Sequence, residues 1–112
     1  MRIEKELMRG AGPAAVLMLL ESGEKYGYEL VQLLDRQSNG VLAMKQSTLY
    51  PLLYNLEAKA LVASRVEEAD NGRPRKYYRL TRKGKQQLAR HRKQWEFLSM
   101  AMDRLGVTGT RT

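Results

Sequence analysis

The spacing of apolar residues along the chain predicts three helices before any strand. The first contains an apolar run from Ala14 to Leu20, which is hydrophobic on almost every side and must be covered by other elements. Proline fits the first turn of a helix but disrupts its interior, so this helix is expected to begin near Pro13. A second helix is expected from about Tyr26 to Gln37, where Ser38-Asn39-Gly40 gives a strong stop signal.

The third helix is expected to begin near Gln46 or Ser47 and to end near Ala60. One of its faces is an apolar stripe with helical spacing, formed by Leu49, Leu52, Leu53, Leu56 and Ala60. The opposite face is small, polar and aromatic, with Ser47, Pro51, Tyr54 and Ala58 at its centre and Tyr50 and Asn55 on its flanks. Periodicity alone leaves two interpretations open: a surface that reads a nucleic-acid groove, or a plain solvated face.

After the third helix the pattern becomes that of a β-hairpin. Strands are expected over Leu61–Glu67 and Lys76–Leu80, because both contain β-branched or aromatic residues with partial alternation. Between them, Asp70-Asn71-Gly72 is typical of a hairpin turn, since Asn-Gly readily adopts the positive φ angles that such turns need. Basic side chains crowd the turn and the returning strand: Arg73, Arg75, Lys76 and Arg79.

The last helix is expected to run from an N-cap at Thr81 to about Leu105, followed by a flexible tail over residues 107–112. Its apolar positions fall on two seams with seven-residue spacing, one with Leu88, Trp95 and Met102 and the other with His91, Leu98 and Leu105. Phe97 and Met100 lie off these seams, so a second face is apolar as well. The helix therefore packs either on a partner chain, the interpretation we favour for so short a chain, or entirely within its own subunit.

Composition narrows the possible functions. A chain of 112 residues with 43% hydrophobic residues is expected to form one domain, and its net charge of +8 attracts polyanions such as nucleic acid. There is no cysteine and only one histidine, and no paired-carboxylate or phosphate-loop motif occurs, so we predict no enzyme activity, no metal site and no cofactor. No apolar run approaches the roughly 20 residues of a membrane span, and a cytoplasmic location without membrane contact is expected.

The order of helix, helix, helix, basic hairpin and helix predicts a mostly helical α+β fold, a winged helix-turn-helix. Three helices and a two-stranded β-wing would occupy residues 1–81, and a C-terminal dimerisation helix residues 82–106. In this fold the second helix of the pair enters the DNA major groove by its N-terminal end. That end and its outward face carry the candidate DNA-binding residues Lys45, Gln46, Ser47, Thr48, Tyr50, Tyr54 and Asn55.

Each of these residue types suits a different part of a DNA duplex. The amides of Gln46 and Asn55 can pair with base edges, and the hydroxyls of Ser47 and Thr48 can donate to phosphates or bases. Lys45 and the free N–H groups of the first turn suit a phosphate. The wing residues Arg73, Arg75 and Lys76 would reach the adjacent minor groove or its phosphates.

Three segments resemble the PadR family of bacterial transcriptional regulators: YGYEL at Tyr26 to Leu30, STLYPLLYNLEAKALV at Ser47 to Val62, and GRPRKYYRLTRKG at Gly72 to Gly84. The single C-terminal helix is similar to the shorter branch of that family. The resemblance implies a homodimer that represses transcription from an inverted-repeat operator, with Ser47–Lys59 as recognition helix and Leu61–Leu80 as wing. It also implies that Tyr50 lies at the DNA surface and Tyr78 in the core.

For the last helix, the resemblance implies that Trp95 lies near the dimer interface, and in some members the equivalent tryptophan binds flat aromatic or drug-like effectors. The residues expected at this interface are Trp95, Leu88, His91, Leu98, Met102 and Leu105. Two departures from the family pattern are Gly12-Pro13, expected to delay or kink the first helix, and Ala60, which stands where glycine is common and is expected to tighten or shift the start of the wing.

Two other functions compete with that of a sequence-specific regulator. A protein with this charge could coat DNA without sequence preference, in which case its affinity would depend steeply on salt and no site would be preferred. The wing and the last helix could instead form a module that binds another polypeptide.

Overall fold

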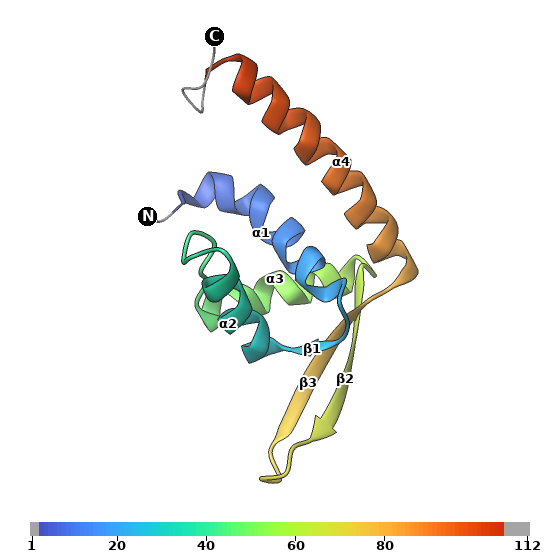
Figure 1. Ribbon diagram of the computed structural model, residues 1–112. Helices are drawn as coiled ribbons and strands as arrows, with labels where there is room; N and C mark the ends of the chain where they lie inside the picture. Colours follow the sequence, from blue (N-terminus) through green and yellow to red (C-terminus); the bar gives the residue numbers. More distant parts are fainter. Residues whose placement is uncertain (1–2, 107–112) are drawn as a thin grey trace.

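The computed structural model describes residues 3–106 and contains four helices and three strands (Figure 1). In chain order these are α1 (Lys5–Leu20), β1 (Lys25–Tyr26), α2 (Gly27–Gln37), α3 (Gln46–Ala58), β2 (Val62–Glu68), β3 (Pro74–Leu80) and α4 (Arg82–Arg104). The predicted mostly helical α+β fold is confirmed. The tail expected over residues 107–112 lies outside the described residues.

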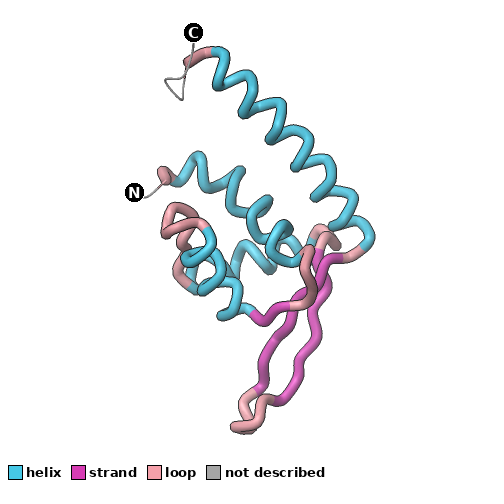
Figure 2. Tube along the Cα trace, in the orientation of Figure 1, coloured by secondary structure: helices cyan, strands magenta, loops and turns pink. Residues whose placement is uncertain are grey.

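The sheet has three antiparallel strands in the order β1-β3-β2 (Figure 2): β2 and β3 form the predicted two-stranded wing, and β1 is a further strand that was not predicted. The extra strand, β1, is two residues long and pairs Lys25 with Tyr78 and Tyr26 with Tyr77. Such a short strand leaves no alternation in the sequence, and only its pairing with the distant β3 defines it. The helix-turn-helix pair α2–α3 is thereby joined directly to the wing.

The β2–β3 hairpin closes through a three-residue loop. Ala69 N donates to Arg73 O at 2.9 Å, and within the loop only Gly72 has a positive φ, 78°. A glycine in that conformation is typical of three-residue hairpin loops, whereas a two-residue turn centred on Asn71-Gly72 would need positive φ at both positions. The predicted hairpin is confirmed, with Asn71 in an ordinary conformation.

Helix α1 begins at Lys5, so the prediction of a start near Pro13 is wrong, and Pro13 lies inside the helix. Lys5, Glu6, Leu7 and Met8 are strong helix formers that extend the helix in the N-terminal direction. The proline removes one backbone hydrogen bond, and the burial of the half that follows it offsets this loss.

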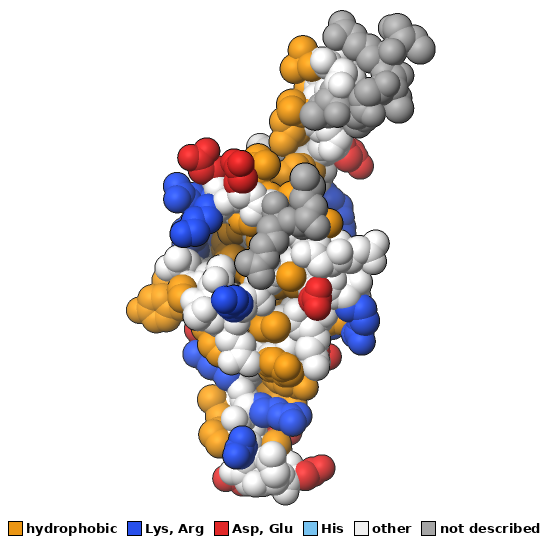
Figure 3. Space-filling view, turned by 90° about the vertical axis from the view of Figure 1, so that its left-hand side faces the viewer, with side chains coloured by type: hydrophobic (Ala, Val, Ile, Leu, Met, Phe, Trp, Pro, Cys, Tyr) orange, Lys and Arg blue, Asp and Glu red, His pale blue; other side chains and the backbone are white. Residues whose placement is uncertain are grey.

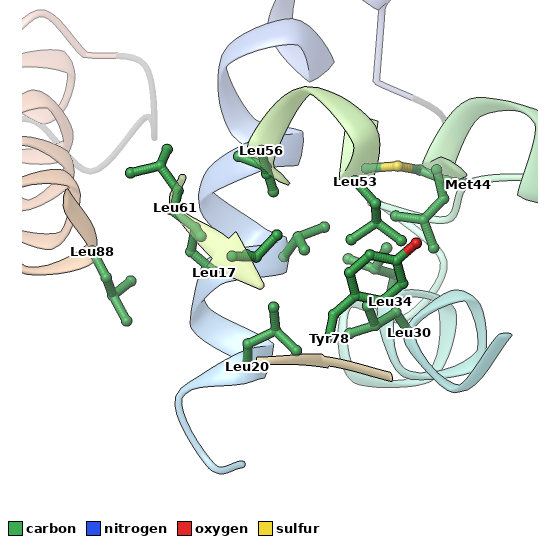
Figure 4. Packing of buried hydrophobic residues seen from close by; sticks show 13 residues of the cluster. Leu17, Leu20, Leu30, Leu34, Met44, Leu53, Leu56, Leu61, Tyr78 and Leu88 are labelled. Atoms are coloured by element: carbon green, nitrogen blue, oxygen red, sulfur yellow. The ribbon is translucent and has the colours of Figure 1, made fainter. Parts of the chain in front are cut away.

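The core lies between the helices and the inner part of the sheet (Figure 4). Helix α3 contributes Leu49, Leu53 and Leu56, which confirms most of its predicted stripe. Ala60 is not part of the stripe, because α3 ends at Ala58 and Ala60 is exposed with a left-handed φ of 61°. Tyr78 is buried, as the family resemblance implied.

Helix α4 starts against the wing and then extends beyond the body of the subunit, away from the wing (Figure 1). Its predicted N-cap is confirmed, since Thr81 Oγ1 accepts a hydrogen bond from Gly84 N at 2.9 Å. Only Gly84 and Leu88 of this helix are buried. Leu88 belongs to the subunit's own core and therefore cannot face a partner chain, so the prediction that it lies at a dimer interface is wrong.

Candidate nucleic-acid interface

The N-terminal end of α3 presents four polar side chains to solvent. Lys45 is the N-cap residue, and Gln46, Ser47 and Thr48 form the first turn; all four are exposed. The carbonyl oxygen of Lys45 accepts from Thr48 N at 3.0 Å and from Leu49 N at 2.9 Å, so the helix is regular from its first turn. Apart from that of Thr48, the backbone N–H groups at the start of the helix have no intrahelical partner, so this end offers donors for an anion.

The outward face of α3 has the exposure expected from its periodicity. The side chain of Tyr54 is 72% exposed and that of Tyr50 is 43% exposed, and Asn55 is also exposed. Tyr54 lies on the side opposite the buried leucine stripe, and Tyr50 and Asn55 lie on the flanks of that side, so the stripe fixes the direction in which they point. This face can therefore contact a ligand without disturbing the core.

The three wing cations are all exposed, but two of them contact other groups of the same chain. The Arg75 guanidinium lies 4.7 Å from the centre of the Tyr26 ring, and Lys76 Nζ lies 3.5 Å from Glu57 Oε1 on α3. Arg73, in the loop, makes no ion pair within residues 3–106. Successive β3 side chains point to opposite sides of the sheet, so Lys76 and Tyr78 share the side that carries the contact with α3.

An open groove of about 610 Å³ runs between the wing and the helix-turn-helix pair. Its lining combines residues predicted separately, Tyr50 from α3 with Arg73, Arg75 and Lys76 from the wing. It also includes Tyr26 and Tyr28, which sequence reasoning did not select although both lie in the YGYEL segment. Tyr28 is 46% exposed, and an exposed tyrosine at the start of α2, beside a basic hairpin, was the available signal.

Burial and pairing alter the pKa values of two groups near this groove. Burial raises the pKa of Tyr78, and the nearby Lys76 partly opposes this change. Hydrogen bonds from Arg65 hold the pKa of Glu24 below its usual value. Both groups keep their ordinary charge at neutral pH, with Tyr78 neutral and Glu24 ionised.

A second surface runs along the part of α4 that leaves the body. Trp95, Leu98, Met102 and Leu105 are 38%, 48%, 40% and 74% exposed, and Phe97 and Met100 are exposed as well. Figure 3 shows hydrophobic side chains along one edge of this projecting end. His91 is half-buried, with its Nε2 atom 2.8 Å from Gln87 Nε2, while its buried Nδ1 atom has no partner within the described part of the chain.

The surroundings of Trp95 do not form an enclosed cavity in this chain. The shallow depression beside it is lined by α4 alone: Arg92, Trp95, Glu96, Ser99 and Met100. Arg92 makes a bidentate ion pair with Glu21, with Nη1–Oε2 and Nη2–Oε1 distances of 2.7 and 2.6 Å. This pair connects α4 to the end of α1 and lowers the pKa of Glu21.

Other kinds of site find no support among residues 3–106. No group of three or more His, Asp or Glu side chains there is arranged to hold a metal ion. None of the helices described combines the length and the apolar character that a membrane crossing requires.

Comparisons with known proteins agree with this geometry. Residues 16–90 match the model of the transcriptional regulator PadR-like family. A PadR family regulator from Eggerthella lenta is 36% identical, with a TM-score of 0.78 over 89% of this chain and 85% of that one. A Streptococcus transcriptional regulator is 31% identical, with a TM-score of 0.78 over 91% of this chain and 98% of that one.

Bacillus subtilis PadR, solved in complex with operator DNA, is 29% identical, with a TM-score of 0.66 over 70% of this chain and 44% of that one. The predicted winged helix fold is confirmed by these similarities. The family comprises transcriptional regulators, which are not enzymes. The chain belongs to the PadR-like family of transcriptional regulators.

Proposed function

We propose that the chain is a homodimeric repressor that binds an inverted-repeat operator in double-stranded DNA. One observation carries this proposal: the groove beside the wing is lined by Tyr50 of α3 and by Arg73, Arg75 and Lys76 of the wing, so both candidate DNA-binding elements open to the same side. The net charge of +8 supplies the long-range attraction to a polyanion. The operator complex of Bacillus subtilis PadR, a member of the same family, supports the choice of DNA as partner.

The N-terminal end of α3 would enter the major groove. Gln46 and Asn55 would then contact base edges, while Lys45, Ser47 and Thr48 would contact phosphates or bases. The wing would reach the adjacent minor groove through Arg73 and its neighbours.

The DNA phosphate backbone between the major and the minor groove would lie in the protein's own groove, between α3 and the wing. Tyr28 and Tyr50 line this groove, and a tyrosine hydroxyl group is a suitable donor to a phosphate oxygen. The ion pair between Lys76 and Glu57 would have to compete with DNA for the same ammonium group. Arg73, which has no such competitor, is expected to give the larger share of the wing's affinity.

Dimerisation would use the part of α4 that follows Leu88. The exposed side chains there are too large and too numerous to remain in water on one long helix, and a second copy of α4 is the partner that we propose. Residues 1–81 would then act as the DNA-binding domain and α4 as the dimerisation helix. Half-sites would lie about one helical turn apart, roughly 34 Å, so that both recognition helices can dock.

A small planar aromatic or drug-like effector would bind between the two subunits at Trp95. In one subunit the lining of this site comes from α4 alone, so the partner would supply the opposite wall. Such an effector can release DNA only if it prefers the arrangement in which the two recognition helices no longer match their half-sites. We also propose that the protein acts in the cytoplasm, where its DNA target lies.

Selection of bound sites from random double-stranded DNA at physiological salt tests this function. We expect enrichment of one inverted repeat, and Arg73→Ala with Arg75→Ala should weaken binding to it strongly. The matched control removes two cations from α4, Arg90→Ala with Lys93→Ala, and should have a much smaller effect because α4 projects away from the wing (Figure 1). Binding without any preferred sequence would favour an architectural DNA-binding protein instead.

A further inference from the structure

One side of the wing carries a continuous run of charged and aromatic side chains. Arg65 on β2 lies opposite Tyr77 on β3 in the strand register, and its guanidinium is 4.9 Å from the centre of the Tyr77 ring. The same guanidinium makes a bidentate ion pair with Glu24, with Nε–Oε2 and Nη2–Oε1 distances of 2.8 and 2.5 Å. Glu24 comes directly before β1, so this pair ties the wing to the segment that leads into α2.

The run continues from Tyr77 towards the DNA-binding surface that we propose. The rings of Tyr77 and Tyr26 meet edge to face, with their centres 5.8 Å apart and their planes at 68°. The Arg75 guanidinium lies over the Tyr26 ring, 4.7 Å from its centre. Glu24 is thus connected to Arg75 through three intervening side chains, Arg65, Tyr77 and Tyr26.

Backbone pairing alone attaches the wing only weakly to the helix-turn-helix pair. Strand β1 pairs with β3 at only two positions, Lys25 with Tyr78 and Tyr26 with Tyr77. The remainder of the hairpin extends beyond the helices (Figures 1 and 2). A bidentate contact at the base of this hairpin restricts the angle between the hairpin and the helices, because two parallel hydrogen bonds fix both the distance and the orientation of the guanidinium.

We propose that Glu24 is a positioning residue for DNA binding, which fixes the angle of the wing through Arg65 and so places Arg75 at the edge of the groove. This inference rests on the proposed function. It has an unusual consequence, because Glu24 is an anion close to a surface that binds a polyanion. By charge alone its removal would tighten DNA binding, whereas its role in positioning makes removal weaken it.

The test compares Glu24→Gln with Glu68→Gln, measured by fluorescence anisotropy with the selected operator. Glu68 is also an exposed wing carboxylate, and it makes no ion pair within residues 3–106. We expect Glu24→Gln to weaken binding about two- to fivefold, the range given by an exposed ion pair. Glu68→Gln should bind as tightly as the unmodified protein or more tightly. Equal or tighter binding by Glu24→Gln would overturn the proposal.

A double-mutant cycle separates positioning from a general loss of structure. In a chain that already carries Arg65→Gln, the further change Glu24→Gln should no longer weaken binding, since only its charge effect remains. If Glu24→Gln weakens binding equally in both backgrounds, Glu24 does not act through Arg65 and the proposal is wrong.

Hydrogen exchange of the DNA-free protein gives a readout that does not depend on the proposed function. Glu24→Gln should speed amide exchange in β3 around residues 75–78 and leave exchange in α1 unchanged. Unchanged exchange in β3 would contradict the positioning role even if the protein binds its operator. Altered exchange in a protein that binds no specific DNA would instead refute the proposed function and leave the contact between Glu24 and the wing supported.

Discussion

Replacing Gly84 by alanine is expected to destabilise the protein by about 3 kcal/mol, although alanine is the better helix former. A Cβ atom at this position would lie 1.9 Å from the carbonyl oxygen of Leu61 and 3.0 Å from its carbonyl carbon. Both atoms belong to the backbone, so no side-chain rotation can relieve the overlap. The first turn of α4 would have to move away from the turn between α3 and β2.

That movement would break contacts that hold the two segments together. Thr81 N donates to Leu61 O at 3.1 Å, and Thr81 Oγ1 donates to Ala60 O at 2.6 Å. Two hydrogen bonds contribute about 1 kcal/mol each, and overpacking of a tight contact costs about 1–3 kcal/mol. The helix preference of alanine over glycine returns about 1 kcal/mol. The net loss is therefore about 2–4 kcal/mol.

Urea denaturation followed by circular dichroism, at one fixed protein concentration, measures this effect. The matched control is Gly10→Ala in α1, where an added Cβ would meet no heavy atom within 4 Å beyond the adjacent residues and the backbone of its own helix. The control should be stabilised by up to about 1 kcal/mol, so the two Gly→Ala changes should have opposite signs. A Gly84→Ala protein as stable as the unmodified chain would refute the close packing of α4 on Leu61.

Three further predictions concern a backbone conformation, the proposed dimer contact and an ion pair. Ala60→Gly should raise the free energy of unfolding by about 1 kcal/mol, because Ala60 has a left-handed φ of 61° that glycine adopts without a Cβ clash; a lower urea midpoint would contradict this. Leu98→Asp with Met102→Asp should turn the proposed dimer into a monomer that keeps its helical circular dichroism, and sedimentation equilibrium decides this. The pKa of Glu21 is lowered in the folded protein because Arg92 donates hydrogen bonds to it. The pair therefore stabilises the fold at pH values above the pKa of Glu21 in the unfolded chain, near 4.5, and this stabilisation is lost as the pH falls through the pKa of the folded state. Glu21→Gln should therefore flatten the acid side of the stability profile, and identical profiles for the two proteins would count against the pair.

The helices could be predicted where a long apolar stripe specified them. Leu49, Leu53 and Leu56 repeat at helical spacing, and this stripe fixed both the helix and the direction of its exposed face. The start of α1 could not be predicted in this way, because two local preferences disagree there. Proline favours the first turn of a helix, whereas the four residues from Lys5 to Met8 favour a helix that begins before it. Local preferences of similar size leave such a boundary to tertiary packing.

The groove beside the wing depends on contacts between distant parts of the chain. Sequence reasoning placed Tyr50 and the wing cations on exposed surfaces but did not place Tyr26 and Tyr28 beside them. Those tyrosines reach the groove because β1 pairs with β3, about fifty residues later in the chain. A two-residue strand has no periodicity of its own, so its partner had to be known before its role could be recognised.

The apolar pattern of α4 raised a different ambiguity. Leu88 and Trp95 occupy equivalent positions seven residues apart, yet Leu88 is buried in the subunit's core and Trp95 is 38% exposed. A heptad pattern shows that a helix has an apolar face without showing which neighbour covers it. The apolar face of α4 stops packing on the core where the helix leaves the body, between Leu88 and Trp95.

The attachment of α4 explains how one helix can affect both of the elements that we propose to bind DNA. Its first turn is bonded to Ala60 and Leu61, which lie between the end of α3, the proposed recognition helix, and the start of the wing strand β2. Any rotation of α4 relative to the body therefore acts at the junction of these two elements. In a dimer joined through α4, the distance between the two DNA-binding surfaces would be set by this junction and by the pair of Glu21 with Arg92. Close packing at Gly84 leaves α4 little freedom there, so a change in half-site spacing would require the subunits to move at their shared interface.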